Sequence, residues 1–424
     1  MSCRAAASEL VGQAIVRLAS DAEIATALAG IPGSTPRVVV SGNLATPWRL
    51  VTRLEGALEA GRVFVLNPFP GWSEHSGLTI ETPFVGSGCR GRASVAYIPM
   101  RLSLVPRLFE TTWQPDAVLV QTSTPRGQRV SLGIEVNILP AAIEAVRRRG
   151  GRVIAQFNAR MPYTFGDGEL DIADIDLALE DDAALPQHER LTPDAASCEI
   201  AERITRFASD GGTIQSGIGK IPDAVLGRLQ HFRQLGVWSE MVSDGLMELA
   251  RAGSLDETRP ITTTFLCGSS ELYEWANEND RLEVRRTELV NDPARISLQP
   301  AMLSVNAALQ VDLYDQANAS YVGGQIYSGF GGQPDFVSGS LHSKGGHAVV
   351  GLHAWHNGTD SSAIIPLLST PATSFQHSVV VTEHGAAELL GLSEIEQASL
   401  LIASAADPRA RDDLCAAAAH MHLG

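Results

Sequence analysis

The stretch Ser216-Gly-Ile-Gly-Lys-Ile-Pro222 decides the fold, because it repeats a pattern already present at Ser41-Gly-Asn-Leu-Ala-Thr-Pro47. Each stretch leads into a segment with apolar residues at helical spacing. Ser, Gly, Pro, Arg and Leu coincide between the copies at one offset of 175 positions, from 216 − 41 and from 229 − 54. Both copies therefore predict a strand, a glycine turn, a proline and a helix. A unit that recurs in each half predicts two similar α/β domains.

Strands and helices alternate along the first half of the chain, which is typical of a mostly parallel sheet covered by helices. Residues 5–30 predict one or two surface helices, and residues 141–149 predict a helix that ends at a glycine pair. Residues 127–132 alternate like the hairpin partner of the strand before them. Short apolar runs predict strands at residues 37–41, 63–66, 93–98, 117–121 and 152–156.

A polar segment without periodic pattern, Asp181 to Thr192, marks the boundary between the two predicted domains. We place the N-terminal domain at residues 1–188 and the C-terminal domain at residues 189–424. Thr192 is the predicted N-cap of the helix that opens the second domain. Near the end of the chain, Ser393 and Glu396 have the spacing of a capping box.

Composition limits the classes of function. The 424 residues exceed a single compact core, and a net charge of −16 argues against a nucleic-acid partner, which needs a basic face. Five scattered cysteines indicate a reducing compartment rather than a disulfide framework or a zinc site. No apolar run approaches the ~20 residues that span a bilayer, and residues 1–10 lack a signal-peptide core. We therefore expect a cytoplasmic protein without a membrane partner.

The stretch Leu235-Gly-Val-Trp-Ser-Glu240-Met-Val-Ser-Asp-Gly245 places a carboxylate at the end of a short apolar strand. Ser243 and Asp244 are good N-cap residues for the helix that follows. Ligands of open α/β sheets bind at this edge, so Glu240 is the candidate nucleophile. The local sequence alone favours a solvated loop glutamate, because most loop carboxylates have no chemical role.

Five motifs in the second half resemble those of the acetyl-CoA hydrolase/transferase family, which are glutamate-dependent CoA-transferases that include 4-hydroxybutyrate CoA-transferases. The motifs are Gln215-Ser-Gly-Ile-Gly-Lys-Ile-Pro-Asp223, Ser239-Glu-Met-Val-Ser-Asp-Gly245, Ala307-Ala-Leu-Gln-Val-Asp-Leu313, Gly331-Gly-Gln-Pro-Asp-Phe336 and Val381-Thr-Glu-His-Gly385. In the first half Tyr97-Ile-Pro, Pro106-Arg-Leu-Phe and Ser131-Leu-Gly agree as well. The resemblance spans roughly residues 35 to 415 and implies two similar three-layer α/β/α domains with mostly parallel sheets.

The resemblance also implies the chemistry. The Glu240 carboxylate attacks an acyl-CoA, giving an acyl-glutamyl anhydride and then a glutamyl-CoA thioester that a carboxylic acid resolves in ping-pong fashion. CoA is then a substrate, and no metal or redox cofactor is implied. The family also suggests a homodimer. An acyl-CoA hydrolase on the same fold is the alternative, and a non-catalytic acyl-CoA-binding protein is a third reading.

Glycine loops supply backbone amides for the oxyanions that such attacks create. By the resemblance, Gln215, Ser216, Gly217 and Gly219 form the oxyanion and substrate-binding turn. Asn291 is implied to contact CoA, together with Gly331, Gly332 and Gln333. Considered without the resemblance, the glycines also fit ordinary turns and Asn291 fits a turn cap. Asp223 fits a helix start, and Asp335 fits a loop organiser.

The segment from His353 to Pro366 departs from the family pattern, because the usual basic residues are missing there. We therefore consider that Trp355 and Tyr163 shape a pocket for a bulkier or less charged acyl group. His353 and His356, like His420 and His422, have ligand-like spacing, but no third ligand is evident and we expect no metal.

Overall fold

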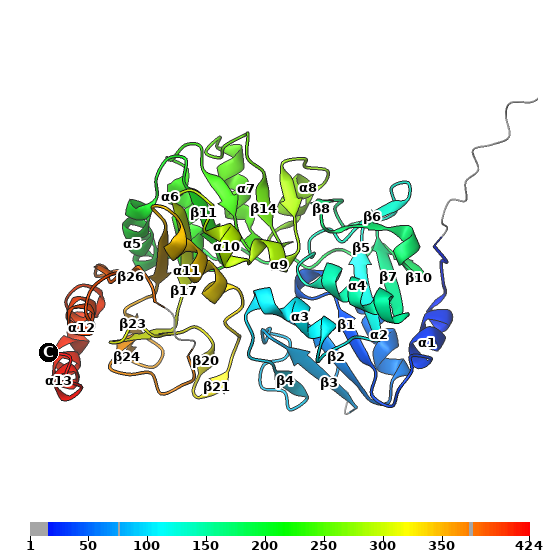
Figure 1. Cartoon of the computed structure of the whole chain (residues 1–424), viewed down its shortest axis with the longest axis horizontal. Helices are drawn as coiled ribbons and strands as arrows, with labels where there is room; N and C mark the ends of the chain where they lie inside the picture. Colours follow the sequence, from blue (N-terminus) through cyan, green and yellow to red (C-terminus); the bar gives the residue numbers. More distant parts are fainter. Residues whose placement is uncertain (1–15, 75–76, 373–375) are drawn as a thin grey trace, which may run out of the picture.

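A computed structural model describes residues 16–74, 77–372 and 376–424 of the chain. Two α/β lobes lie side by side along the longest axis of the molecule, with the N-terminal half at one end and the C-terminal half at the other (Figure 1). The first fifteen residues, and with them the start of the predicted surface helices, lie outside the described residues. The described part of that segment forms one helix, α1 (Asp21–Ala29), with Ser20 and Glu23 in a capping box.

The first sheet has seven strands, and all neighbouring pairs are parallel. Its valine-rich central strand is buried on both faces, with Val38 and Val40 in one apolar cluster and Val39 in the other. Such two-sided burial is typical of parallel sheets. In spatial order the strands are β10 (Leu177–Asp181), β7 (Arg152–Asn158), β5 (Ala117–Thr122), β1 (Arg37–Val40), β2 (Gly61–Val65), β3 (Leu78–Thr82) and β4 (Val95–Tyr97).

The second sheet repeats this order, which confirms the predicted duplication. When the strands are counted in chain order within each half, the seven strands of the first sheet and seven strands of the second have the same spatial order. The second sheet has one further strand at each edge. In spatial order the strands are β27 (Ala386–Glu388), β26 (Val379–Val381), β22 (His347–Gly351), β17 (Met302–Ala307), β11 (Thr213–Ser216), β12 (Gly236–Trp238), β14 (Ile261–Thr263), β16 (Leu282–Val284) and β8 (Phe165–Gly166). The last of these comes from the first half of the chain, so the two halves share a sheet.

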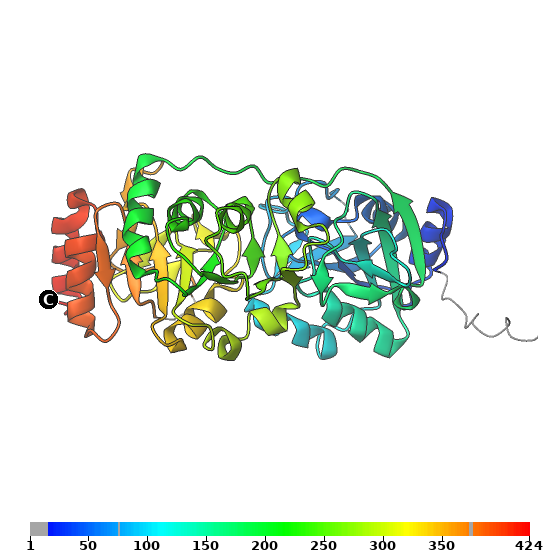
Figure 2. The same ribbon diagram turned by 90° about the horizontal axis from the view of Figure 1, so that it is seen from above.

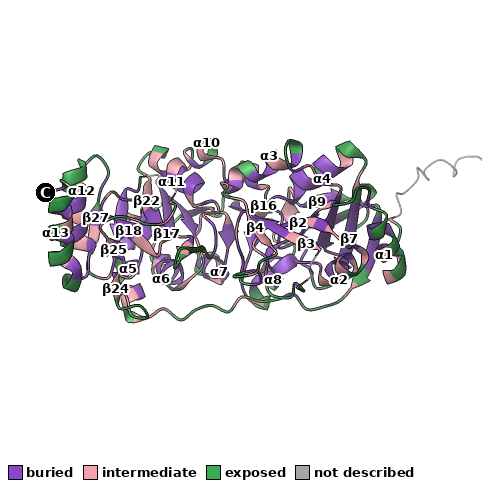
Figure 3. Cartoon of the chain, turned by 90° about the horizontal axis from the view of Figure 1, so that it is seen from below, coloured by how far each residue is buried: buried purple, intermediate pink, exposed green. Residues whose placement is uncertain are grey.

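Helices cover both faces of each sheet, which gives three layers in each half (Figure 2). On the first sheet, α1 and α2 (Trp48–Ala57) pack on one face, opposite α3 (Val105–Glu110) and α4 (Leu139–Arg149). The second half contributes α5 (Ala195–Ile204), α6 (Lys220–Leu229), α7 (Asp244–Arg251), α8 (Ser270–Ala276), α9 (Thr287–Val290), α10 (Pro293–Ile296), α11 (Gln333–His342), α12 (Glu394–Leu400) and α13 (Arg411–His420). In Figure 3 the strands are mainly purple, hence buried, beneath partly exposed helices.

Several local predictions need correction. The strand at residues 129–131 (β6) pairs with β9 (Glu169–Asp171) rather than with the strand before it. Strand β3 was not predicted, because its polar Thr79 and Glu81 interrupt the apolar pattern. Asp194, not Thr192, caps α5, because its carboxylate accepts the backbone N–H of Ser197. The capping box of Ser393 and Glu396 at the start of α12 is confirmed.

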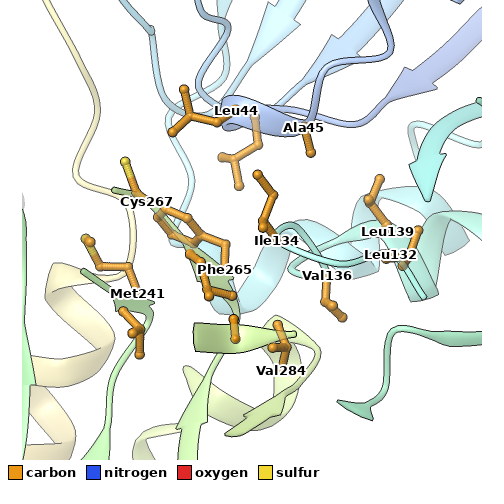
Figure 4. Packing of buried hydrophobic residues seen from close by; sticks show 14 of the residues in the cluster. Leu44, Ala45, Leu132, Ile134, Val136, Leu139, Met241, Phe265, Cys267 and Val284 are labelled. Carbon is orange, nitrogen blue, oxygen red and sulfur yellow. The ribbon is translucent and has the colours of Figure 1, made fainter. Parts of the chain in front are cut away.

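Residues 182–194 have no regular secondary structure and run as an extended connection across the top of the molecule in Figure 2. The predicted boundary between residues 188 and 189 falls in this segment. Because β8 crosses into the second sheet, the boundary stays a prediction. The two halves also share one continuous apolar core. Figure 4 shows part of it, where Leu44 and Ile134 of the first half approach Phe265 and Met241 of the second.

Candidate active site

Glu240 lies where β12 ends, at the carboxyl edge of the second sheet. Its main chain and that of the next two residues are held by residues 264–266. The carbonyl oxygen of Glu240 accepts hydrogen bonds from the Thr264 amide at 3.0 Å and the Thr264 hydroxyl at 2.7 Å. The next residues, Met241 and Val242 (β13), pair with Phe265 and Leu266 (β15). This short second pairing holds the backbone in place, so the side chain of Glu240 is directed into a cleft at the sheet edge.

The cleft has a volume of 360 Å³ and lies between the two halves of the molecule. Glu240 is the single charged side chain among the described residues that line it. From the first half the lining residues are Asn43, Leu66, Asn67, Phe84 and Leu102. The second half contributes Gln215, Ser216, Gly217, Gly331, Gly332 and Gln333, with further apolar and small residues. Seven predicted site residues, Glu240 among them, therefore share one cleft.

Burial raises the pKa of Glu240 to about 7, and the nearby Asp335 carboxylate acts in the same direction. The Asn291 amide and the Gly332 backbone N–H donate to Glu240 and lower its pKa, but burial outweighs them. The Asn291 Nδ2 lies 2.9 Å from Glu240 Oε2. A carboxylate with a pKa near neutrality is only partly ionised at rest and is a stronger nucleophile than an ordinary surface glutamate.

Gly332 lies against the carboxylate so closely that only glycine fits. A Cβ atom at this position would lie 1.8 Å from Glu240 Oε2 and 2.1 Å from Asn291 Nδ2. The preceding Gly331 has φ of +50°, which glycine adopts without strain. The loop therefore brings a backbone N–H to the reactive oxygen without a side chain in between. This is the geometry that oxyanion stabilisation requires.

The first half of the chain holds this glycine loop in place. The Leu102 amide donates to the carbonyl oxygen of Gly331 at 3.1 Å. Two residues into α11, Asp335 accepts the Ser103 hydroxyl at 2.8 Å and the Ser103 amide at 3.2 Å. Burial raises the pKa of Asp335 to about 6. Asp335 thus holds the loop in place, which is the role considered for it from the sequence. Its hydrogen bonds to Ser103 link the two halves beside Glu240.

Gln215 and Ser216 are the last residues of β11, and both are buried. The Gln215 Oε1 accepts the Ser304 hydroxyl at 2.5 Å, so the Gln215 amide nitrogen remains the donor end of the side chain. Gly217 lines the cleft, whereas Gly219 does not. Gly219 is instead the N-cap of α6, with φ of +129°. Gly219 was predicted to lie next to the substrate. In the structure it shapes the turn before α6.

Asn291 is fully buried at the end of α9 and is not among the cleft-lining residues. Its side-chain amide donates to Glu240, and its predicted contact with CoA stays a prediction. The structure also corrects the proposed pocket role of Trp355 and Tyr163, because neither lines the cleft. Trp355 stacks against Arg409, and the Tyr163 hydroxyl donates to Glu169.

Sequence reasoning missed three polar residues in the first half. Asn43 and Asn67 line the cleft, and Asn43 donates to the buried Glu135 at 2.7 Å. The internal repeat could have identified Asn43, because the offset of 175 positions matches it with Ile218, which lines the opposite wall. No local signal singled out Glu135, which follows the Ser131-Leu-Gly133 motif.

Among the described residues, no group of three or more His, Cys, Asp and Glu side chains is placed to hold a metal ion. His353 Nε2 lies 3.0 Å from the Ser197 hydroxyl, and His356 Nε2 lies 2.6 Å from the Leu309 carbonyl oxygen. The same residues include no helix that is long and apolar enough to cross a membrane.

The chain matches known proteins along most of its length. It is 37% identical over 350 residues to the 4-hydroxybutyrate coenzyme A transferase of Clostridium kluyveri, covering 78% of this chain and 80% of that protein. An acetyl-CoA hydrolase of Neurospora crassa is 32% identical over 195 residues, covering 45% of this chain and 37% of that protein. Residues 268–418 match the family described as acetyl-CoA hydrolase/transferase C-terminal domain.

Solved structures agree with the sequence relatives. The crystal structure of RipA from Yersinia pestis has a TM-score of 0.88 at 27% identity, covering 96% of this chain and 98% of that one. The 4-hydroxybutyrate CoA-transferase of Porphyromonas gingivalis has a TM-score of 0.77 at 27% identity, covering 94% and 96%. Together with the sequence relatives, these structures show that the chain belongs to the acetyl-CoA hydrolase/transferase family and is an enzyme of its CoA-transferase or hydrolase type.

Proposed function

We propose that the protein transfers CoA between an acyl-CoA and a carboxylic acid, with the Glu240 carboxylate as nucleophile. The observation that carries this proposal is the position of Glu240. Of the described residues that line the cleft it is the single charged one, and it lies between two hydrogen-bond donors, Asn291 and Gly332. Its pKa near 7 leaves enough of the ionised form to attack at neutral pH.

In the first step a Glu240 oxygen attacks the thioester carbonyl carbon, the C–S bond breaks and CoA leaves as a thiolate. The product is a mixed anhydride between the acyl group and Glu240. The thiolate then attacks the glutamyl carbonyl carbon of this anhydride and expels the acyl group as a free carboxylate. A glutamyl-CoA thioester remains on the enzyme.

The second half of the cycle reverses these steps with a different carboxylic acid. The acceptor carboxylate attacks the glutamyl-CoA carbonyl, thiolate leaves, and attack of the thiolate on the acceptor side of the new anhydride restores Glu240. Each attack creates an oxyanion, for which the Gly332 N–H and the Asn291 amide are the nearest donors. The cycle needs only acyl transfer between oxygen and sulfur, so CoA takes part as a substrate and we propose no metal or redox cofactor.

Hydrolysis of acyl-CoA on the same site is the second candidate, because relatives named acetyl-CoA hydrolase share this family. Water would then resolve the anhydride or the glutamyl-CoA thioester in place of a carboxylic acid. The distinction depends on how well the cleft excludes water during the lifetime of the intermediate.

We also propose that the protein acts as a cytoplasmic homodimer. The family resemblance supports the dimer. The four cysteines among the described residues are free thiols, which agrees with a reducing compartment. Light scattering at micromolar concentration gives the mass directly, and a monomer would contradict the proposed assembly.

The decisive experiment combines product analysis with mass spectrometry of the enzyme. Acetyl-CoA is incubated with the protein, with and without butyrate, and the Glu240 peptide is examined for CoA adducts. We expect butyryl-CoA to form only with butyrate, and Glu240 to carry CoA. Glu240→Ala should lower turnover roughly a thousandfold or more, as loss of a nucleophile does elsewhere.

Glu59→Ala is the control, because Glu59 is an exposed glutamate that is not among the cleft-lining residues. Release of CoA in buffer alone, without a new acyl-CoA, would assign the protein as a hydrolase. Full turnover by Glu240→Ala would refute the proposal in both forms.

A further inference from the structure

Glu135 is a buried carboxyl group that the catalytic cycle above does not use. It lies in the loop between β6 and α4 and is 1% exposed. Its two oxygens have different surroundings. Oε2 accepts the Asn43 amide at 2.7 Å, whereas Oε1 finds no hydrogen-bond partner among the described residues. A buried carboxylate with one unpaired oxygen is costly, so the surroundings favour the protonated, uncharged acid.

Hydrogen bonds connect Glu135 to the wall of the cleft through two asparagines. The Asn67 Nδ2 donates to Asn43 Oδ1 at 2.7 Å, and the Asn43 Nδ2 donates to Glu135. Because Asn43 accepts on one side and donates on the other, its amide has a fixed orientation. Asn43 and Asn67 follow the neighbouring parallel strands β1 and β2, and both line the cleft. Removing the acceptor Glu135 would free the Asn43 amide to rotate.

The cleft has no group that could neutralise an anionic acyl chain. Within the described part of the chain, its lining residues include neither Arg nor Lys, and Glu240 supplies the one charge. An acyl group ending in a carboxylate would bring a second negative charge close to Glu240, with amides as its only polar partners in the N-terminal wall. Like charges in a site shielded from water repel strongly. An uncharged acyl chain meets no such penalty against Leu66, Phe84 and Leu102.

We propose, as a consequence of the function proposed above, that Glu135 is a positioning residue that keeps Asn43 and Asn67 as an uncharged wall, and that this wall selects uncharged acyl groups over those ending in a carboxylate. The selection acts on the acyl chain that enters the cleft beside Glu240. Glu135 itself touches neither the acyl group nor CoA and acts through Asn43.

The ionisation of Glu135 limits the pH range in which its side chain and the two asparagines together carry no charge. Burial raises the pKa of Glu135 to about 8, and the Glu240 carboxylate adds to the effect. The Cys267 thiol also interacts electrostatically with Glu135, and burial raises the pKa of this thiol to about 12. Between about pH 7 and 8, more than half of Glu240 is therefore ionised while more than half of Glu135 remains neutral. Above that range Glu135 gains a charge that repels the oxyanions and the thiolate of the reaction.

The test compares butyryl-CoA with succinyl-CoA, which have four-carbon acyl chains and differ in the terminal carboxylate. With acetate as acceptor, we expect kcat/KM for butyryl-CoA to be on the order of 100-fold higher, since like-charge contacts in a site cost several kcal/mol. For butyryl-CoA the pH profile of kcat/KM should rise through about pH 7 and fall above about pH 8. Glu135→Gln should keep the preference and remove the fall at high pH, because glutamine is an uncharged acceptor of similar shape.

Glu59→Gln, which neutralises an exposed glutamate, should leave the whole profile unchanged. Equal use of the two substrates, or preference for succinyl-CoA, would overturn the selection, and this comparison needs only the wild-type enzyme. An unchanged fall at high pH in correctly folded Glu135→Gln would overturn the role of Glu135. If wild type transfers CoA from neither substrate and Glu240 carries no adduct, the proposed function fails and this inference falls with it.

Discussion

At the scale of single residues, the site depends on how closely a backbone approaches a side chain. Gly332 is positioned so that its amide reaches the Glu240 carboxylate, and a methyl group there would overlap the carboxylate and the Asn291 amide. The same contact lowers the pKa of Glu240, which burial would otherwise raise further. Gly332 thus contributes both to the ionisation of Glu240 and to the space that this carboxylate needs.

Gly332→Ala should lower kcat about 100-fold, because displacing a reactive group by about 1 Å costs that much in other enzymes. The matched control is Gly227→Ala in α6, where a new Cβ meets nothing within 4 Å. That control should keep wild-type kcat and gain up to about 1 kcal/mol of stability from its helix propensity. Steady-state kinetics on folded protein decide the matter, and a wild-type kcat for Gly332→Ala would contradict the proposed contact.

At the scale of elements, the two halves use the same strand, turn and helix for different purposes. In the second half the turn after β11 presents Gln215, Ser216 and Gly217 to the cleft. In the first half the turn after β1 presents Asn43, whose backbone N–H donates to the Leu66 carbonyl oxygen at 3.1 Å. Asn43 and Asn67 have φ of +46° and +50°, a region that asparagine tolerates better than most residues.

Gly42 allows the turns after β1 and β2 to approach, since a Cβ there would lie 1.9 Å from the Leu66 carbonyl oxygen. Gly42→Ala must move one backbone segment, so we expect a loss of about 1–3 kcal/mol in unfolding free energy. Urea denaturation measures the change. Gly56→Ala in α2, where a Cβ meets nothing within 4 Å, is the control and should not lower the midpoint. Equal midpoints for the two variants would argue against a tight turn at Gly42.

At the scale of the whole molecule, folding buries several carboxyl groups, of which Glu240 lines the cleft. Burial raises the pKa of Glu135 to about 8, of Glu240 to about 7 and of Asp223 and Asp335 to about 6. In the unfolded chain these groups would titrate near 4 to 4.5. The folded state therefore binds more protons than the unfolded state between about pH 4 and about pH 8.

Stability should consequently fall by on the order of several kcal/mol as the pH rises from about 5 to about 8. The sign follows because the stabilisation of a group with a raised pKa is complete below its unfolded pKa and is lost as the pH passes its folded pKa. Urea midpoints at pH 5.5 and 8.5 test this, and Glu135→Gln should show a smaller difference than wild type. Midpoints that rise over this range would contradict the burial of these acids.

Much of the fold and part of the site could be predicted from the sequence, because their causes are local. The strand, turn and helix at Ser41 and Ser216 follow from hydrophobic period and from glycine and proline, which act within a few residues. The same local logic placed Glu240 at a strand end and identified the capping box at Ser393. Where several polar residues interrupt a strand, as in β3, this logic failed.

Only the tertiary structure decided which distant residues meet. Asn291 reaches Glu240 across 51 positions, and Asn43 reaches Glu135 across 92. The raised pKa of Glu240 and the uncharged wall facing it arise from burial by both halves, which no local pattern encodes. Strand β8 joins the second sheet for the same reason. Propensity acts between neighbours in sequence, whereas burial, hydrogen bonding and charge depend on neighbours in space, which the chain acquires only when the two halves pack together.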